Sequence, residues 1–292
     1  MSDVFRTPDE AFAGLPGYDF APRYVEQDGL RMHYVDEGAG DPVLLLHGEP
    51  TWAYLYRKLI PELAPAARVV APDYFGFGRS DKPTELGWYS YDGHYRSLER
   101  LAEALDLRRA TVVVQDWGGP LGLRLAVEHP ERFDRIVVMN TGVFAGRPPS
   151  DEWLRFRDFV RRVGGEIRPG QLVRISCVTE VPDEVVAAYD APFPTPESKA
   201  GVLAFPELVP TEPEHPSAAA MLAVRDALGR WEKPALVLFS DSDPIFSPRV
   251  GDRFAELIPG AGPAEVVEGA GHFLQEDAGE RIGARIAAFL RS

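Results

Sequence analysis

Short apolar runs rich in β-branched side chains recur along the chain. They lie at Val43–Leu46, Val69–Ala71, Thr111–Val114, Ile136–Met139, Ala235–Phe239 and Glu265–Val267. Runs that are almost entirely apolar are typical of strands buried on both faces of a parallel sheet. Stretches with helical spacing separate them, such as Leu98 to Leu107 and Leu121 to Ala126. This alternation predicts an α/β fold with a mostly parallel, doubly wound sheet.

The alternation stops between residues 145 and 229. Proline-rich turns (GRPPSDEW, APFPTPE and VPTEPEHPS) separate short helical patterns at Trp153–Val163 and Asp183–Tyr189, and we find no buried strand. A structureless loop of this length is uncommon in a compact protein. We therefore predict a helical cap domain at 145–229, inserted into a core domain formed by 1–144 and 230–292. Ligands of open α/β sheets bind at the carboxyl ends of the strands, so a cap would cover that site.

Composition narrows the classes of partner. The chain has 292 residues, and its 45 acidic residues exceed its 31 basic ones to give a net charge of −14. This excess argues against nucleic acid or an anionic membrane as a partner. The single cysteine, Cys177, excludes an internal disulfide and a multi-cysteine zinc site. With neither a long apolar run nor a secretory signal at the start, we expect a cytoplasmic monomer that acts on a small molecule.

The sharpest chemical signal is VVVQDWGG, in which a buried strand ends and glycines follow Asp116 and Trp117 at once. A strand, a tight turn and a helix form the nucleophile elbow, usually G-x-S-x-G, which exposes its central residue. Here Asp116 occupies the serine position and Val114 replaces the first glycine. The alternative is that Asp116 caps the following helix, as aspartate often does. The motif alone leaves both interpretations open.

A second motif, LLLHGEP, runs from a buried strand into His47-Gly48-Glu49-Pro50. In α/β-hydrolases this loop gives one backbone N–H to the oxyanion hole, and the residue after the nucleophile gives the other. The two donors would be the N–H groups of Glu49 and Trp117. A simple Gly-Pro turn is the alternative. For His47 we favour a buried structural role over a catalytic one.

The remaining members of a catalytic triad are expected late in the chain. His272 lies in the glycine-rich segment GAGHF after the last strand, which fits the order nucleophile, acid, histidine. The segment FSDSDP contains two candidate acids, Asp241 and Asp243, and we favour Asp243. Asp241 could equally be a turn residue. Some proteins of this architecture carry the acid after the strand that follows the nucleophile helix. In this chain that position is Asn140, which has no carboxylate.

A carboxylate nucleophile changes the expected chemistry. It is already ionised at neutral pH, can displace a leaving group from a saturated carbon, and leaves an alkyl ester that water hydrolyses. Asp116 therefore favours a dehalogenase or an epoxide hydrolase over an esterase. The indole N–H of Trp117 can point at a departing halide, although epoxide hydrolases also carry tryptophan at this position.

The motifs HGEPTWAYLYRKLIP, APDYFGFGRSDKP, VVVQDWGG, AAYDAPFP, KAGVLAFPELVP and GHFLQED together resemble the haloalkane dehalogenases, over most of the chain. The resemblance implies an α/β-hydrolase fold with Asp116 as nucleophile, His272 as base, Asp243 as acid and Trp117 as a halide donor. It implies that a halogenated alkane and water give an alcohol, a halide ion and a proton. It also implies that neither a metal nor an organic cofactor is needed.

One segment departs from the family pattern. The second halide-binding indole of the family lies on the first cap helix, and Phe156 occupies that position here. Trp153 is three residues earlier, on the same helical face, and either takes over as halide donor or packs in the cap. The resemblance also implies an apolar substrate pocket, which we expect to be walled by Phe156, Phe205, Pro206, Val209, Ile245 and Phe246.

Two further functions stay open at this point. An epoxide hydrolase would use the same Asp116 and His272, with Tyr189, the only cap tyrosine, as its acid. A binding protein with the hydrolase fold would keep the pocket without turnover. Halide release from 1,2-dibromoethane and diol formation from styrene oxide separate the three possibilities.

Overall fold

The computed structural model describes residues 3–143 and 150–291. Within these ranges, eight strands form one sheet in the order β10-β9-β8-β7-β4-β5-β3-β2. All neighbours pair in parallel except β2 with β3 and β3 with β5. The strands are β2 (Arg23–Gln27), β3 (Leu30–Gly38), β4 (Pro42–Leu46), β5 (Arg68–Pro72), β7 (Ala110–Gln115), β8 (Phe133–Met139), β9 (Ala235–Ser240) and β10 (Glu265–Val267). A small antiparallel ribbon joins β1 (Val4–Phe5) to β6 (Lys82–Pro83).

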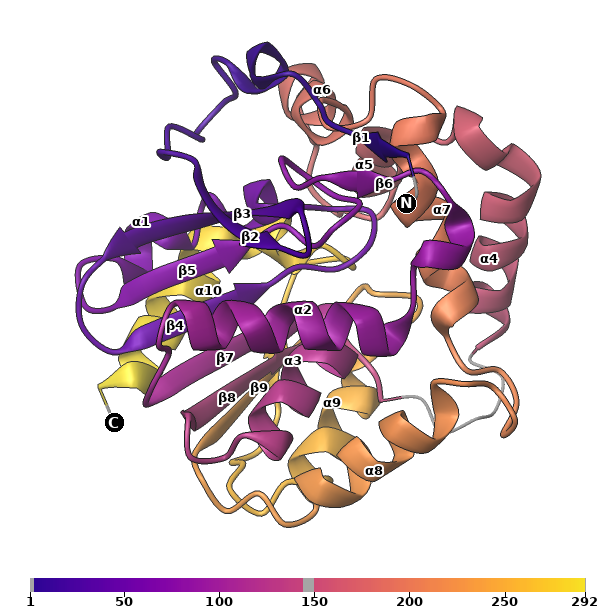
Figure 1. The fold of residues 1–292 in the computed structure, drawn as a ribbon. Helices are drawn as coiled ribbons and strands as arrows, with labels where there is room; N and C mark the ends of the chain where they lie inside the picture. Colours follow the sequence, from indigo (N-terminus) through magenta and orange to yellow (C-terminus); the bar gives the residue numbers. More distant parts are fainter. Residues whose placement is uncertain (1–2, 144–149, 292) are drawn as a thin grey trace.

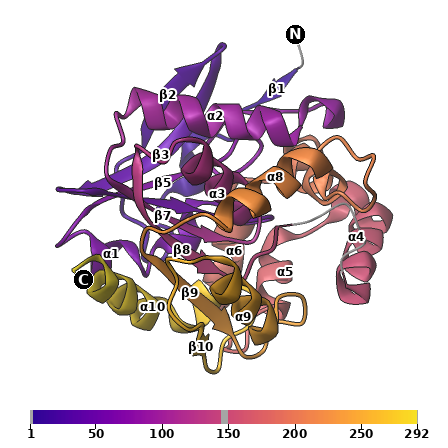
Figure 2. The same cartoon turned by 90° about the horizontal axis from the view of Figure 1, so that it is seen from below.

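Side chains of the central strands alternate between two hydrophobic cores. Leu44 and Leu46 of β4 enter one core, whereas Val43 and Leu45 enter the other. The first core is closed by α2 (Tyr91–Ala104), α3 (Gly118–Glu128) and α9 (Pro248–Leu257), and the second by α1 (Ile60–Leu63) and α10 (Leu274–Leu290). Figures 1 and 2 show these helices on the two faces of the sheet. Two-sided burial explains why long parts of the central strands are apolar.

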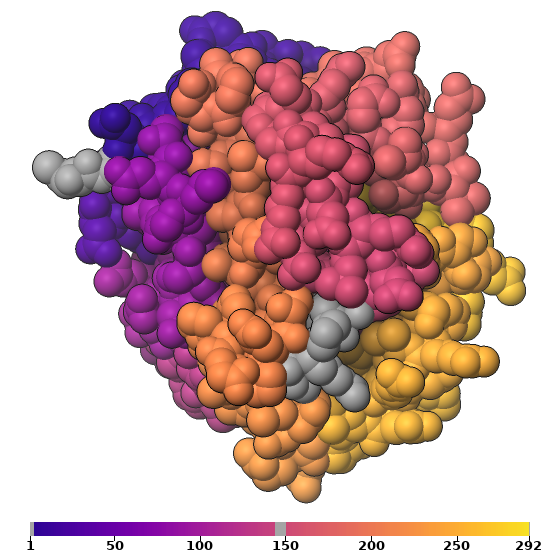
Figure 3. Space-filling model, turned by 90° about the vertical axis from the view of Figure 1, so that its right-hand side faces the viewer, coloured from indigo at the N-terminus to yellow at the C-terminus, as the bar shows by residue number. Residues whose placement is uncertain are grey.

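In the described residues between 150 and 229, helices joined by loops are present and no strand occurs. They are α4 (Asp151–Val163), α5 (Pro169–Ile175), α6 (Asp183–Asp190), α7 (Ala200–Ala204) and α8 (Ala218–Leu228). Short 3-10 helices lie at Gly164–Glu166, Glu197–Lys199 and Phe205–Leu208 within this region, and at Asp9–Phe12, Ala53–Tyr56 and Leu86–Trp88 before it. Figure 3 shows this region, in rose and orange, beside the C-terminal residues in yellow. We call residues 150–229 the cap; the boundary expected between residues 144 and 145 lies outside the described residues.

The six apolar runs of the sequence all correspond to strands of the parallel part of the sheet. The α/β fold with a mostly parallel sheet is confirmed. The antiparallel pair β2 and β3 is absent from our series of apolar runs, because charged and polar residues interrupt both strands and β2 is buried only at Gln27. No helix in the described part of the chain is long and apolar enough to cross a membrane.

Candidate active site

Asp116 lies on a strained turn between β7 and α3. Its φ is 49°, in the left-handed region that non-glycine residues rarely adopt. A Cβ on Gly118 would collide with the carbonyl oxygen of Leu46, so the turn requires glycine there. The N-cap position of α3 is Trp117, without a side-chain capping bond, so Asp116 does not serve as the helix cap. The turn instead presents the Asp116 carboxylate at the carboxyl end of the sheet.

Backbone N–H groups meet this carboxylate. The N–H of Glu49 donates to Asp116 Oδ1 at 2.9 Å, and the N–H of Trp117 also bonds the side chain. Burial raises the pKa of Asp116, while His272 and these two N–H groups favour its ionised form. A Cβ on Gly48 would collide with the carboxylate, so glycine is also required beneath it. The two donors that we expected for an oxyanion hole therefore both contact Asp116.

His272 lies between Asp116 and Asp243. Its Nδ1 is 2.8 Å from Asp243 Oδ2, and its Nε2 is 3.8 Å from Asp116 Oδ2. Burial disfavours the charged imidazole, but the Asp243 carboxylate outweighs burial and raises the pKa of His272. Burial likewise opposes ionisation of Asp243, yet His272 and the N–H groups of Ile245 and Phe246 hold its pKa below the usual value. The histidine can therefore accept a proton on the side that faces Asp116.

We call residues 268–273, between β10 and α10, the histidine loop. Asp241, the other candidate acid, contacts a different part of this loop. Its carboxylate accepts hydrogen bonds from the N–H of Gly269 at 2.9 Å and of Ala270 at 3.3 Å. These bonds lower the pKa of Asp241, which is exposed in the turn. Asp241 thus organises the backbone of the loop, whereas Asp243 contacts the imidazole.

Two strand-end residues that our sequence analysis did not select also hold the histidine loop. Gln115 Nε2, at the end of β7, donates to the carbonyl oxygen of His272 at 3.2 Å. Asn140 Nδ2, after β8, donates to the carbonyl oxygen of Gly271 at 3.0 Å. Both residues are fully buried. In the sequence, each is a polar residue directly at the end of an apolar strand. That pattern could have indicated their place at the carboxyl edge of the sheet, where the site lies.

His47 is fully buried and stacks on Tyr74, with ring centroids 4.1 Å apart. Its Nδ1 donates to the carbonyl oxygen of Gly48 at 2.9 Å, and its Nε2 accepts from the N–H of Tyr74 at 3.2 Å. Burial lowers the pKa of His47 to about 4, so the ring is neutral and its two nitrogens are occupied. This geometry suits a structural role.

An apolar cavity of about 350 Å³ opens over Asp116 and His272. Of the six pocket residues expected from the sequence, Phe156, Pro206, Ile245 and Phe246 line it. Trp117 and Trp153 line it as well. The remaining lining residues are Glu49, Pro50, Asp116, Glu152, Arg155, Phe159, Leu172, Ile175, Ser176, Pro244, His272 and Phe273. The cavity therefore brings Asp116 and His272 to residues of the cap, while Asp243 lies buried behind His272.

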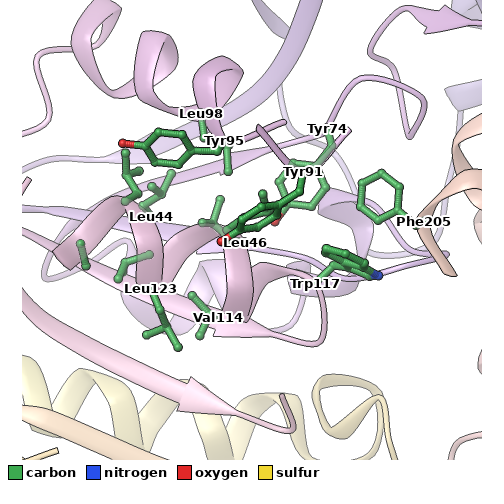
Figure 4. Packing of buried hydrophobic residues seen from close by; sticks show 14 of the residues in the cluster. Leu44, Leu46, Tyr74, Tyr91, Tyr95, Leu98, Val114, Trp117, Leu123 and Phe205 are labelled. Atoms are coloured by element: carbon green, nitrogen blue, oxygen red, sulfur yellow. The ribbon is translucent and has the colours of Figure 1, made fainter. Parts of the chain in front are cut away.

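The expectation that Phe205 and Val209 wall the pocket is wrong, because neither is among the described residues that line the cavity. Phe205 is fully buried behind Trp117, and the two ring centroids are 5.1 Å apart at an interplanar angle of 71° (Figure 4). Val209 is buried in the same hydrophobic core. The 3-10 helix Phe205–Leu208 brings Pro206 to the cavity and leaves Phe205 as the support of the Trp117 ring.

The side chain of Glu49 is a feature that sequence reasoning missed, since we considered only its backbone N–H. The residue is 6% exposed, and its Oε1 is buried without a hydrogen-bond partner in the described structure. Burial and the charge of Asp116 both raise the pKa of Glu49 well above its usual range. The neutral carboxylic acid is therefore favoured beside Asp116.

Comparisons with known proteins identify the family of the chain. Residues 41–163 match the family model of the alpha/beta hydrolase fold. Curated haloalkane dehalogenases from Mycobacterium marinum and Psychrobacter cryohalolentis are 46% and 44% identical to the chain, over 98% of its length and 99% and 98% of theirs. The chain belongs to the haloalkane dehalogenase family.

Solved haloalkane dehalogenases have the same fold. The tetrameric structure of DpaA from Paraglaciecola agarilytica NO2 has a TM-score of 0.92 and 36% identity, covering 99% of this chain and 98% of its own. DatA from Agrobacterium tumefaciens C58 has a TM-score of 0.84 and 28% identity, covering 97% of this chain and 99% of its own.

Our sequence analysis placed the family's second indole at the position of Phe156. The structure places both Phe156 and Trp153 of α4 in the lining of the cavity. Trp153 is 6% exposed, and the Arg157 guanidinium lies 5.3 Å from the centre of its ring. One indole therefore reaches the cavity from the strand side, at Trp117, and one reaches it from the cap.

Tyr189, the acid expected for an epoxide hydrolase, does not reach the cavity. Tyr189 is fully buried, and its hydroxyl donates to Glu276 rather than lining the cavity among the described residues. The haloalkane dehalogenase relatives do not favour an epoxide hydrolase either. In the same described ranges, no group of three or more His, Cys, Asp or Glu side chains is arranged to hold a metal ion.

Proposed function

We propose that the chain hydrolyses haloalkanes to an alcohol, a halide ion and a proton. The observation that carries the proposal is the line Asp116, His272 and Asp243, in which His272 lies 3.8 Å from one carboxylate and 2.8 Å from the other. This line faces an apolar cavity with two indoles in its wall, in a chain of the haloalkane dehalogenase family. The substrate class is a small apolar halogenated alkane, with water as the second substrate.

In the first half-reaction, Asp116 attacks the carbon that bears the halogen. A new carbon–oxygen bond forms while the carbon–halogen bond breaks, and its electron pair leaves with the halide. The indole N–H of Trp117 stabilises the departing ion, and we assign the second donor to Trp153. Because the cavity is largely apolar, a hydrogen bond to the ion is worth more there than in water.

In the second half-reaction, His272 takes a proton from water as the water oxygen attacks Cγ of the Asp116 ester. The N–H groups of Glu49 and Trp117 stabilise the tetrahedral oxyanion that forms. Asp243 orients the imidazole and stabilises its protonated form. Collapse of the intermediate breaks the bond between Cγ and the alkoxide oxygen, and protonated His272 gives its proton to that oxygen, so that the alcohol leaves. The Asp116 carboxyl group then loses the second proton of the water to solvent, which regenerates the carboxylate.

A single-turnover experiment in H₂¹⁸O tests this route. With enzyme in excess over 1,2-dibromoethane, the first turnover should place ¹⁸O in the peptide that contains Asp116 and leave the alcohol unlabelled. Direct attack of water on the substrate would instead label the alcohol. Diol formation from styrene oxide without halide release from 1,2-dibromoethane would contradict the proposed function.

Our expectations for the domain boundary, the localisation and the oligomeric state remain predictions. We propose that 145–229 is a cap domain, that the protein is cytoplasmic and that it is a monomer. The solved relative DpaA is a tetramer, so sedimentation velocity across a range of protein concentrations is the relevant test of the last point.

A further inference from the structure

Asp277 joins the histidine loop to the cap. Its Oδ2 accepts a hydrogen bond from the N–H of Gly271, the residue before His272, at 2.8 Å. Its Oδ1 accepts from the N–H of Thr179 at 2.8 Å and from the Thr179 hydroxyl at 2.6 Å. The N–H of Val178 lies 3.1 Å from both oxygens. A single carboxylate in the first turn of α10 thus bonds both Gly271 of the histidine loop and residues 178–179 of the cap.

The two segments that Asp277 joins also contact each other directly. The backbone N–H of His272 donates to the carbonyl oxygen of Ser176 at 2.9 Å. A Cβ on Gly271 would collide with that same carbonyl oxygen, so the backbones approach as closely as glycine allows. Ser176 lines the cavity. The cap segment of residues 176–179 therefore packs on the backbone of His272.

The neighbouring residue, Glu276, makes a second connection to the cap. Its buried carboxylate pairs with Arg57, whose Nη2 donates to Oε2 at 2.8 Å, and it accepts the hydroxyl of Tyr189 from α6. Lys58 Nζ donates to the Glu276 carbonyl oxygen at 2.6 Å. These contacts fix the start of α10, so Asp277 projects from a rigid base.

Placement in the first turn of a helix would by itself explain an acidic residue, because negative charge is favourable there. It would not explain why the carboxylate accepts four hydrogen bonds from two segments outside α10. We propose that Asp277 is a positioning residue for the hydrolytic half-reaction, which holds the cap segment 176–179 and the His272 loop in one arrangement. The inference rests on the proposed function, because it concerns the proton transfer by His272.

The two half-reactions depend on different groups. Alkylation needs Asp116, which is held by β7 and the Glu49 loop. Hydrolysis needs His272 Nε2 at its correct distance from the Asp116 ester, and a displacement of about 1 Å can cost on the order of 100-fold in rate. Loss of the Asp277 carboxylate should therefore slow hydrolysis and spare alkylation.

Rapid-quench kinetics on the full chain test this expectation. In Asp277→Asn, one carboxylate oxygen becomes an N–H₂ donor that faces backbone donors. The rate constant for halide release in the first turnover should stay unchanged, and the rate constant for ester hydrolysis should fall roughly 10- to 100-fold. The alkyl-enzyme should then accumulate as a mass increase on the peptide that contains Asp116.

Thr179→Val is a milder variant, which removes only the hydroxyl bond to Asp277 and should slow hydrolysis by a few-fold. Asp183→Asn is the matched control, because Asp183 is an exposed cap carboxylate that pairs with Arg174. It should change neither half-reaction.

A general loss of folded enzyme would lower the amount of halide released in the first turnover and leave both rate constants unchanged, without accumulation of the ester. Equal slowing of both steps, or no change in hydrolysis in Asp277→Asn and Thr179→Val, would overturn the inference. A wild-type enzyme that releases no halide would instead refute the proposed function.

Discussion

The two sides of the cavity are built differently. Asp116 and Trp117 follow β7, every residue of which is buried, and the missing Cβ atoms of Gly48 and Gly118 leave no alternative path for the turn. On the cap side, Trp153 and Phe156 project from α4, in which Trp153 and Val160 are the buried residues. Close packing therefore fixes the groups that form and break bonds, whereas the cap side of the cavity wall lies on a helix that is mostly only partly buried.

The largest effects should come from the strand side. Asp116→Ala should abolish halide release, because the nucleophile is gone. His272→Phe should still release one equivalent of halide and then stop as the alkyl ester, since only hydrolysis needs the base. Intact-protein mass spectrometry after addition of 1,2-dibromoethane measures the trapped ester. His129→Phe is the control at another histidine, and steady turnover by His272→Phe would refute the role of His272.

The two acids of the late loop should differ strongly. Asp243→Asn should slow ester hydrolysis on the order of 10³- to 10⁴-fold, because the imidazole loses both its orienting partner and the charge that stabilises its protonated form. Asp241→Asn should have a small effect, because Asp241 contacts only the backbone of the loop and Ser242. Single-turnover rates of the two variants provide the comparison. The reverse order of effects would show that the acid is Asp241.

Measurements of halide affinity compare Trp117, on the strand side of the cavity, with Trp153, on its cap side. A hydrogen bond to a charged group is worth about 1.5–3 kcal/mol, so loss of one donor should weaken halide binding roughly 10- to 100-fold. We expect this loss in Trp117→Phe and, if Trp153 is the second donor, a similar loss in Trp153→Phe. Phe156→Trp should tighten binding if the cap lacks a donor. Halide titration of the intrinsic fluorescence measures all three, with Trp231→Phe as a control in the core, and an unchanged affinity in Trp153→Phe would exclude it as a donor.

The smallest expected effect is a shift in pH dependence. Asp243 and, to a lesser degree, Asp116 raise the pKa of His272 against the effect of burial. Esterification removes the charge of Asp116, so the pKa of His272 should be lower in the alkyl-enzyme than in the free enzyme. Because the base must be neutral, hydrolysis should fall as the pH drops through that lower value. Decay of the alkyl-enzyme followed across pH, beside an NMR titration of free His272, compares the two; equal values would show that Asp116 does not influence the histidine.

The sequence predicted the strand side well because its signals are local. The end of an apolar strand followed by glycines located Asp116, and a glycine-rich segment after the last strand located His272. The cap side was harder to predict. Phe205 and Pro206 are adjacent, and only the packing of their short helix against Trp117 decides which one faces the cavity. The contacts of Asp277 join segments almost 100 positions apart, which no local pattern records.

The cap begins and ends at neighbouring strands. It follows β8 and precedes β9, which pair in parallel, with Ile136 opposite Ala235. Adjacent strands are about 4.8 Å apart, so the two points at which the chain leaves and re-enters the sheet are set by the sheet rather than by the cap. For recombination between relatives, the cap of residues 150–229 is therefore a natural unit of exchange: an exchanged cap could change which molecules enter while the strand pairing beneath it stays the same. Such an exchange must preserve the contact of residues 176–179 with the histidine loop, so Thr179 and Asp277 should be transferred as a pair, as should Tyr189 and Glu276.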